Sequence, residues 1–196
     1  MDAAMPYTTA PSPARITAVL FSLRGCLVHV EADGACPAPG ALACLAQLAE
    51  QSVPCLWLDE QVSDDHSRMA AALPPGLPRQ VGASRPWPAP DACWQALMAL
   101  GSEHVHGVVV VSAEPALLQS ALNAGLWTVG LAACNPACAH SARQWQGLSD
   151  SAQGKARGQA TLALYALGVH SVIDHLEALP LCLDDIAQRL AKGEKP

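Results

Sequence analysis

Short apolar runs alternate with segments of helical periodicity along the whole chain. Residues 16–23 and 107–112 are apolar almost throughout, as expected for strands buried on both faces. Further strands are expected at residues 53–58, 79–83, 127–131 and 170–174. Spacings of three and four between apolar positions predict helices at residues 39–51, 64–73, 89–100, 115–125, 153–167 and 183–192.

This alternation predicts βαβ units, and therefore a Rossmann-like α/β fold with a doubly wound parallel sheet. The length of 196 residues fits one domain, which we place at residues 15–196. Residues 1–14 are rich in Pro, Ser, Thr and Ala and read as a flexible N-terminal segment. Ligands of such sheets bind beyond the carboxyl ends of the strands, so the residues that follow each strand are the candidates.

Composition narrows the class of partner. Eleven Lys and Arg against 17 Asp and Glu give a formal charge of −6, which argues against nucleic-acid binding. Hydrophobic residues make up 51% and charged residues 14%, which excludes a disordered chain. The uncharged stretch 115–142 is broken by Pro115, Gly125 and Pro136, so we expect no membrane span. The N-terminus lacks the basic and apolar regions of a signal peptide, so a cytoplasmic location is expected.

The eight cysteines are expected to be reduced, mostly buried thiols, because nothing in the chain indicates secretion. Cys134, Cys138 and His140 are three candidate zinc ligands, but no further Cys or His pair completes a tetrahedral set. We therefore expect no metal there. A metal or redox role for this cluster remains the alternative.

Several motifs resemble the haloacid dehalogenase (HAD) superfamily, and within it the phosphonoacetaldehyde hydrolase (phosphonatase) branch. Asn123-Ala-Gly-Leu-Trp-Thr-Val-Gly130 and Ala166-Leu-Gly-Val-His-Ser-Val-Ile-Asp174 are similar to phosphonatase segments. Ala83-Ser-Arg-Pro86 resembles the branch's Gly-Arg-Pro segment, and Phe21-Ser-Leu-Arg-Gly-Cys-Leu-Val28 lies where the nucleophile loop belongs. The matches follow the family's order over most of residues 15–196. The resemblance implies a HAD-like core.

The chain departs from the family at the positions that carry its chemistry. Where the resemblance implies an Asp nucleophile after the first strand, this chain has Ser22, and a serine is a poor nucleophile without an adjacent base. Two positions on, where the backbone carbonyl binds Mg²⁺, stands Arg24. Ala113 replaces the Mg²⁺-binding Asp, and Leu58 or Asp59 replaces the phosphate-gripping Thr or Ser. Arg85 keeps the family's basic residue.

The family's cap domain and its Schiff-base lysine are also missing from the expected places. The resemblance places the cap between the first strand and the next core helix, but the chain passes directly from Val28 to Pro39. The only lysines are Lys155, Lys192 and Lys195. We therefore expect a capless HAD-like core without Schiff-base chemistry.

These departures predict a phosphonatase-related protein that has lost hydrolase activity, binds no Mg²⁺, and binds a small anion or a protein partner, including a second copy as a homodimer. No catalytic residue is assigned, and Ser22 holds only the nucleophile position. The residues of this vestigial site are Ser22, Arg24, Gly25, Cys26, Asp59, Arg85, Ala113 and Glu114.

Two questions stay open at this point. Arg24, Arg85 and the amides of residues 22–26 could cradle an anion, or Arg24 could pair with Asp59 or Glu114 and close the site. The alternative function is a HAD-family hydrolase with displaced catalytic groups, drawn from Asp59, Glu114 or Cys26.

Overall fold

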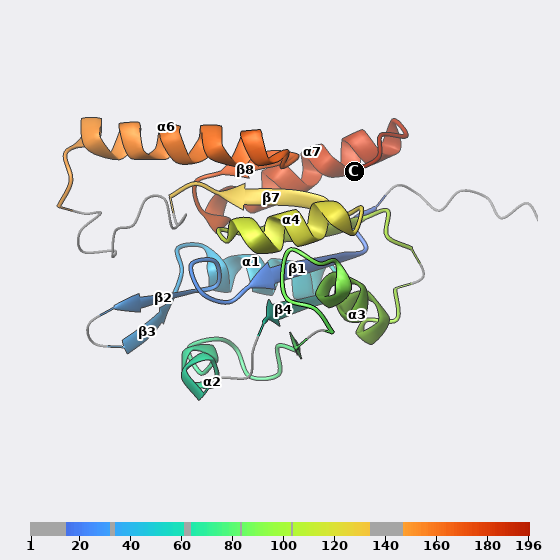
Figure 1. The fold of residues 1–196 in the computed structure, drawn as a ribbon. Helices are drawn as coiled ribbons and strands as arrows, with labels where there is room; N and C mark the ends of the chain where they lie inside the picture. Colours follow the sequence, from blue (N-terminus) through green and yellow to red (C-terminus); the bar gives the residue numbers. More distant parts are fainter. Residues whose placement is uncertain (1–14, 32–33, 61–63, 83, 103, 134–146) are drawn as a thin grey trace, which may run out of the picture.

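A computed structural model describes residues 15–31, 34–60, 64–82, 84–102, 104–133 and 147–196. Six strands form one sheet in the order β5-β4-β1-β6-β7-β8, and each neighbouring pair runs parallel (Figure 1). The strands are β1 (Ala18–Ser22), β4 (Cys55–Asp59), β5 (Arg79–Val81), β6 (Val108–Ser112), β7 (Trp127–Leu131) and β8 (Ser171–Ile173). The predicted doubly wound, Rossmann-like parallel sheet is confirmed.

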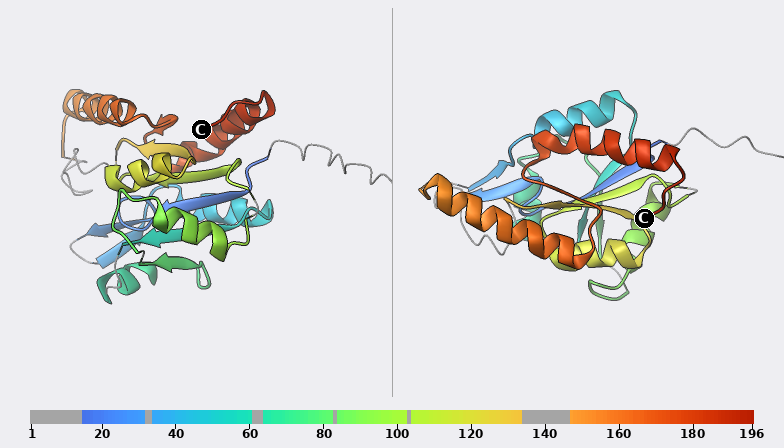
Figure 2. Two further views of the ribbon diagram at one scale, coloured as in Figure 1. Left: turned by 45° about the vertical axis from the view of Figure 1, so that its right-hand side comes forward. Right: turned by 90° about the horizontal axis from the view of Figure 1, so that it is seen from above.

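Helices cover both faces of this sheet (Figure 2). The helices are α1 (Ala41–Glu50), α2 (Asp64–Ala70), α3 (Asp91–Ala99), α4 (Pro115–Asn123), α6 (Asp150–Leu167) and α7 (Leu179–Ala191), with a 3₁₀ turn η2 (Leu176–Ala178). Strand β1 shows how the layers separate, since Val19 and Phe21 pack in the core with α1 and α7, whereas Ala18 and Leu20 pack with α3 and α4. Alternate residues of the strand thus face opposite sides of the sheet, and both sides are covered by helices. The strand sequences are therefore continuously apolar.

Several stretches differ from the expectation. β2 (Val28–Glu31) and β3 (Gly34–Pro37) pair antiparallel as a hairpin between β1 and α1, a region that shows no clear strand pattern in the sequence. Helix α7 begins at Leu179 rather than at 183, because Pro180 lies in its first turn, where a missing N–H breaks no helical hydrogen bond.

The long helix α6 begins at Asp150 rather than at 153. Its start is fixed by Ser149, whose side chain accepts a hydrogen bond from the N–H of Ala152. Among the helices that the structure describes, none has both the length and the apolar character needed to cross a membrane.

Candidate functional site

The candidate site lies where the sheet reverses its order. From β1 the chain goes on to β4 and β5 on one side, whereas β6 leads to β7 and β8 on the other. The crevice of an open parallel sheet lies outside the carboxyl ends of the two central strands at such a point. Here these strands are β1, which ends at Ser22, and β6, which ends at Ser112.

The two serines that end these strands are hydrogen-bonded to each other. Ser112 Oγ donates to Ser22 Oγ at 2.9 Å, and the same Ser112 oxygen accepts from the backbone N–H of Glu114 at 2.8 Å. Ser22 is 5% exposed and Ser112 is fully buried. Ala113, between Ser112 and Glu114, is also buried and supplies only a methyl group. The centre of the crevice is therefore formed by neutral groups, with hydroxyls satisfied within the protein.

The loop that follows β1 is bound tightly to the sheet. Gly25 has a φ of 73°, which favours glycine, and its N–H bonds to the Val28 carbonyl at 2.9 Å. Cys26 is fully buried, and its Sγ donates to the carbonyl of Val111 on β6 at 3.5 Å. Arg24 stands on the outside of this loop with an exposed side chain. The loop geometry thus buries the thiol and turns the guanidinium to solvent.

Asp59 and His66 form a pair at the end of β4, the strand beside β1. Asp59 Oδ2 and His66 Nδ1 are in direct contact, and the aspartate side chain is 8% exposed against 28% for the imidazole. Because β4 delivers Asp59 and α2 carries His66, the pair fixes α2 to the carboxyl edge of the sheet. His66 is a site residue that the sequence analysis did not identify, since nothing in the pattern links it to Asp59.

The expectation that Arg24 closes the site by pairing with Asp59 or Glu114 is wrong. In the part of the chain that the structure describes, Arg24 forms an ion pair with neither carboxylate, and Asp59 is paired with His66 instead. The short loop of residues 23–27 holds Arg24 outward, whereas Asp59 is buried at the strand end.

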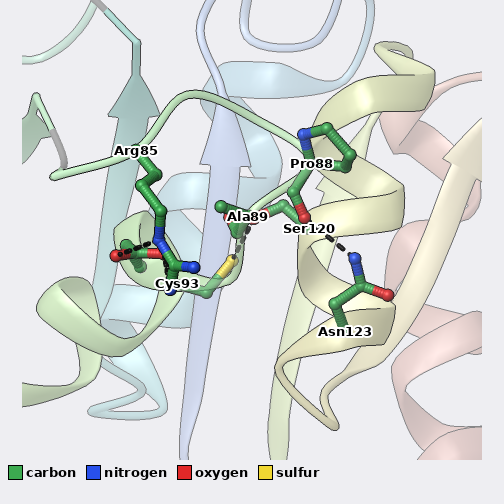
Figure 3. A network of polar contacts seen from close by, with 7 residues as sticks. Arg85, Pro88, Ala89, Cys93, Ser120 and Asn123 are labelled. Carbon is green, nitrogen blue, oxygen red and sulfur yellow. Dashed lines mark hydrogen bonds and ion pairs between the residues drawn. The ribbon is translucent and has the colours of Figure 1, made fainter.

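Arg85 lies on a loop that is fixed at several points. Its guanidinium pairs with Asp91 at the start of α3, at 3.1 Å. The neighbouring backbone is held from helix α4, because Ser120 donates to the Ala89 carbonyl at 2.6 Å and Asn123 to the Pro88 carbonyl at 2.9 Å (Figure 3). From the strand side, Glu60 accepts from the N–H of Trp87 at 2.8 Å.

This arrangement engages Arg85 without burying it. Its side chain remains 65% exposed although it is paired with Asp91. The structure therefore brings Ser22, Cys26, Ala113 and Glu114 together at the β1–β6 edge, and it holds Arg85 on a separate, preorganised loop.

The cysteines that the structure describes carry no disulfide. Burial raises the pKa of Cys44 to about 12, with a smaller contribution from nearby Cys55. Burial likewise raises the pKa of Cys55 and of Cys93 to about 11. These thiols are therefore protonated and unreactive at neutral pH.

A metal site is not formed by the side chains that can be placed. Within the described ranges, no group of three or more His, Cys, Asp and Glu side chains is arranged to hold a metal ion. The Cys134, Cys138 and His140 cluster lies outside the described residues.

The chain is similar in sequence to known enzymes over one part of its length. It is 38% identical over 110 residues to the phosphonoacetaldehyde hydrolase of Klebsiella pneumoniae, a match that covers 56% of this chain and 40% of that enzyme. The phosphonoacetaldehyde hydrolase of Salmonella typhi is 39% identical with the same coverage. The chain thus matches less than half the length of these relatives. No family model matches it.

Solved structures extend the likeness over most of the chain. One is 47% identical with a TM-score of 0.84, and the match covers 92% of this chain and all of that one. A phosphonoacetaldehyde hydrolase-like protein from Oleispira antarctica is 27% identical with a TM-score of 0.72, covering 82% of this chain and 60% of its own. A HAD family hydrolase from Deinococcus radiodurans is similar in fold alone, at 17% identity and a TM-score of 0.64.

Fold and sequence together place the chain in the HAD superfamily, whose members include hydrolases. Within that superfamily it belongs with the phosphonoacetaldehyde hydrolase-like, or phosphonatase-like, proteins. Its own activity is a separate question, because the matched segment is only part of the named enzymes.

Proposed function

We propose that this phosphonatase-like protein no longer hydrolyses its family's substrates and instead binds a small anion or a protein partner at the carboxyl edge of the sheet. The observation that carries the proposal is the hydrogen bond between Ser112 and Ser22. It occupies the centre of the crevice with two neutral hydroxyls at positions where the family resemblance implies acidic chemistry.

Among the residues that the structure describes, no base contacts Ser22. The group that contacts its oxygen is the hydroxyl of Ser112, which donates a hydrogen bond and does not take up a proton at neutral pH. A serine becomes an effective nucleophile when an adjacent base removes its proton. Losing the nucleophile from an enzyme of this kind lowers turnover by about 10⁶-fold.

The residues at the crevice do not fit the Mg²⁺ that the family implies. Mg²⁺ prefers carboxylate oxygens, and Ala113 offers none at the position of the family's acidic ligand. Asp59 is engaged by His66, and the hydroxyls of Ser22 and Ser112 are engaged with each other. We therefore infer no Mg²⁺-dependent step in this protein.

A capless, single-domain architecture over residues 15–196 is part of the same proposal. The described residues between β1 and α1 form the tight loop and the β2–β3 hairpin, and no helical domain lies among them. With no lysine before Lys155, the chain also lacks a group for Schiff-base chemistry in that region. Without a cap, this edge of the sheet is left for another protein to contact, including a second copy of this chain.

Arg24 is the side chain best suited to recruit an anion. It is exposed beside the loop amides of residues 22–26, and it forms no ion pair with a described carboxylate. A guanidinium recognises phosphate or carboxylate through two parallel hydrogen bonds. Arg85 is less available, because Asp91 already engages it.

The Asp59–His66 pair supports a second candidate function, a hydrolase with displaced catalytic groups. A buried carboxylate that orients a partly exposed imidazole is an arrangement that can serve as a general base. In this alternative, His66→Gln removes an activity that Ser22→Ala leaves intact. The leading proposal expects neither variant to remove an activity, because none is present.

Binding of Mg²⁺ and inorganic phosphate by isothermal titration calorimetry tests the leading proposal. We expect no saturable Mg²⁺ binding, and phosphate binding that Arg24→Gln weakens about tenfold. Arg68→Gln is the matched control, because Arg68 is an exposed arginine on α2 that pairs only with the exposed Asp65 among described carboxylates. Saturable Mg²⁺ binding that Asp59→Asn abolishes would contradict the proposal and favour a rebuilt active site.

A further inference from the structure

A second cleft opens beside the amino end of the edge strand β5, away from the carboxyl ends of the strands. It has a volume of about 440 Å³ and lies between α2, the connection that follows it, and β5. Pockets for small ligands fall in the range of about 300–1,000 Å³. Its lining includes Trp57, Ser67, Leu73, Pro74, Leu77 and Arg79.

Arg79 is the only charged residue among the described residues that line this cleft. Its Nη1 donates to Ser67 Oγ at 3.2 Å, and its guanidinium carbon lies 5.8 Å from the centre of the Trp57 ring. Contacts from α2 and β4 thus hold the guanidinium in place. Among the described residues no carboxylate forms an ion pair with Arg79, in contrast to Arg68, Arg85, Arg157 and Arg189.

Besides Arg79 and Ser67, the described residues of the lining have apolar side chains and none is acidic. Pro74 and Leu77 supply the accessible apolar surface, because Trp57 and Leu73 lie almost fully buried behind it. A fixed cation beside an apolar wall is complementary to a molecule that carries one anionic group on an apolar body.

We propose that this cleft binds a small amphipathic anion, with its carboxylate or phosphate group on Arg79, which Ser67 positions, and its aromatic or aliphatic body against Pro74 and Leu77. The bidentate guanidinium fixes the acid group, and the apolar wall selects for the body. The cleft shares no residue with the site at the carboxyl edge of the sheet, so this proposal is independent of the proposed function.

Benzoate, phenyl phosphate and inorganic phosphate are the probes, with binding followed by calorimetry and by the indole N–H signals of the five tryptophans in ¹H–¹⁵N NMR spectra. Trp57→Phe assigns the signal of Trp57. We expect benzoate or phenyl phosphate to shift that signal saturably, and Arg79→Gln to weaken binding about tenfold or more. Inorganic phosphate, which has no apolar body, is expected to bind more weakly than phenyl phosphate.

The Trp57 signal separates this cleft from the carboxyl-edge site. Arg68→Gln, which removes an exposed arginine from α2, is the control and is not expected to change the saturable shift of that signal. Ser67→Ala provides a milder second variant, with an expected weakening of a few-fold. Absence of a saturable shift of the Trp57 signal with both organic probes, or a shift that Arg79→Gln leaves unchanged, would overturn the proposal.

Discussion

Ser112 donates a hydrogen bond to Ser22 at 2.9 Å and thereby joins the carboxyl ends of β6 and β1, the two strands at the centre of the sheet. Both residues are buried, and Ser112 also accepts from the N–H of Glu114 at the start of α4. One hydroxyl therefore connects two strands and a helix terminus. We propose that the pair is a structural element at positions where the family resemblance implies reactive groups.

Removing either hydroxyl is expected to destabilise the fold. Ser112→Ala leaves the Glu114 N–H and the Ser22 hydroxyl without this partner in a buried setting, so the free energy of unfolding should fall by about 1–3 kcal/mol. Urea denaturation measures it. In a double-mutant cycle with Ser22→Ala, the coupling energy should be about 1 kcal/mol.

The exposed Ser151→Ala serves as the control and should change stability by less than about 0.5 kcal/mol. If the stability losses of Ser22→Ala and Ser112→Ala add strictly in the double variant, the hydrogen bond between the two serines contributes nothing to stability.

The Asp59–His66 contact is expected to stabilise the position of α2. His66→Ala removes the imidazole from a carboxylate that is only 8% exposed, so stability should fall by about 1–3 kcal/mol. Arg68→Ala on the same helix breaks a pair whose side chains are 77% and 78% exposed, and should cost less than about 1 kcal/mol. Thermal unfolding measures both changes in stability. Equal losses of stability in the two variants would show that the burial of Asp59 does not strengthen its contact with His66.

His170 should make stability depend on pH. Burial, and secondarily the charge of Arg189, lowers the pKa of His170 below its ordinary value of 6.5. Its Nδ1 accepts from the N–H of Thr128 at 3.1 Å, so the folded state requires an unprotonated Nδ1. The unfolded state therefore binds more protons near and below pH 6.5, and the free energy of unfolding falls as the pH decreases through that range.

Urea titrations at pH 5.5 and 7.5 measure this dependence. The difference between the two pH values should be smaller in His170→Asn than in the native protein, whereas the exposed His104→Asn should leave it unchanged. An identical difference in all three proteins would exclude His170 as its source.

The buried thiols should resist alkylation while the protein is folded. With a pKa of about 12 for Cys44 and about 11 for Cys93, very little thiolate is present at pH 8. Mass spectrometry after iodoacetamide treatment should find both residues unmodified, and both modified once the protein is unfolded in urea. Rapid alkylation of Cys44 in the folded protein would contradict the burial of α1 against the sheet.

The sequence was sufficient to predict the sheet, because its strands are buried on both faces and therefore read as continuous apolar runs, as in β1 and β6. It was not sufficient to predict the β2–β3 hairpin. Those short strands pair with each other outside the main sheet and are only partly buried, so they lack a hydrophobic signature.

The candidate site was predictable in part. The topology rule identified Ser22, Asp59, Ala113 and Glu114, since each lies at or just after a strand end. The rule could not identify which side chains these residues contact, because those contacts depend on the tertiary structure. His66 reaches Asp59 from a helix, and the loop geometry turns Arg24 outward.

Whether this protein hydrolyses phosphonates or phosphate esters is measured by phosphate release from phosphonoacetaldehyde and from an aryl phosphate, at high protein concentration and with and without Mg²⁺. We expect no release above that of a Ser22→Ala protein under any of these conditions. Mg²⁺-dependent turnover that survives Ser22→Ala and disappears in Asp59→Asn would contradict it and show an active site rebuilt around Asp59.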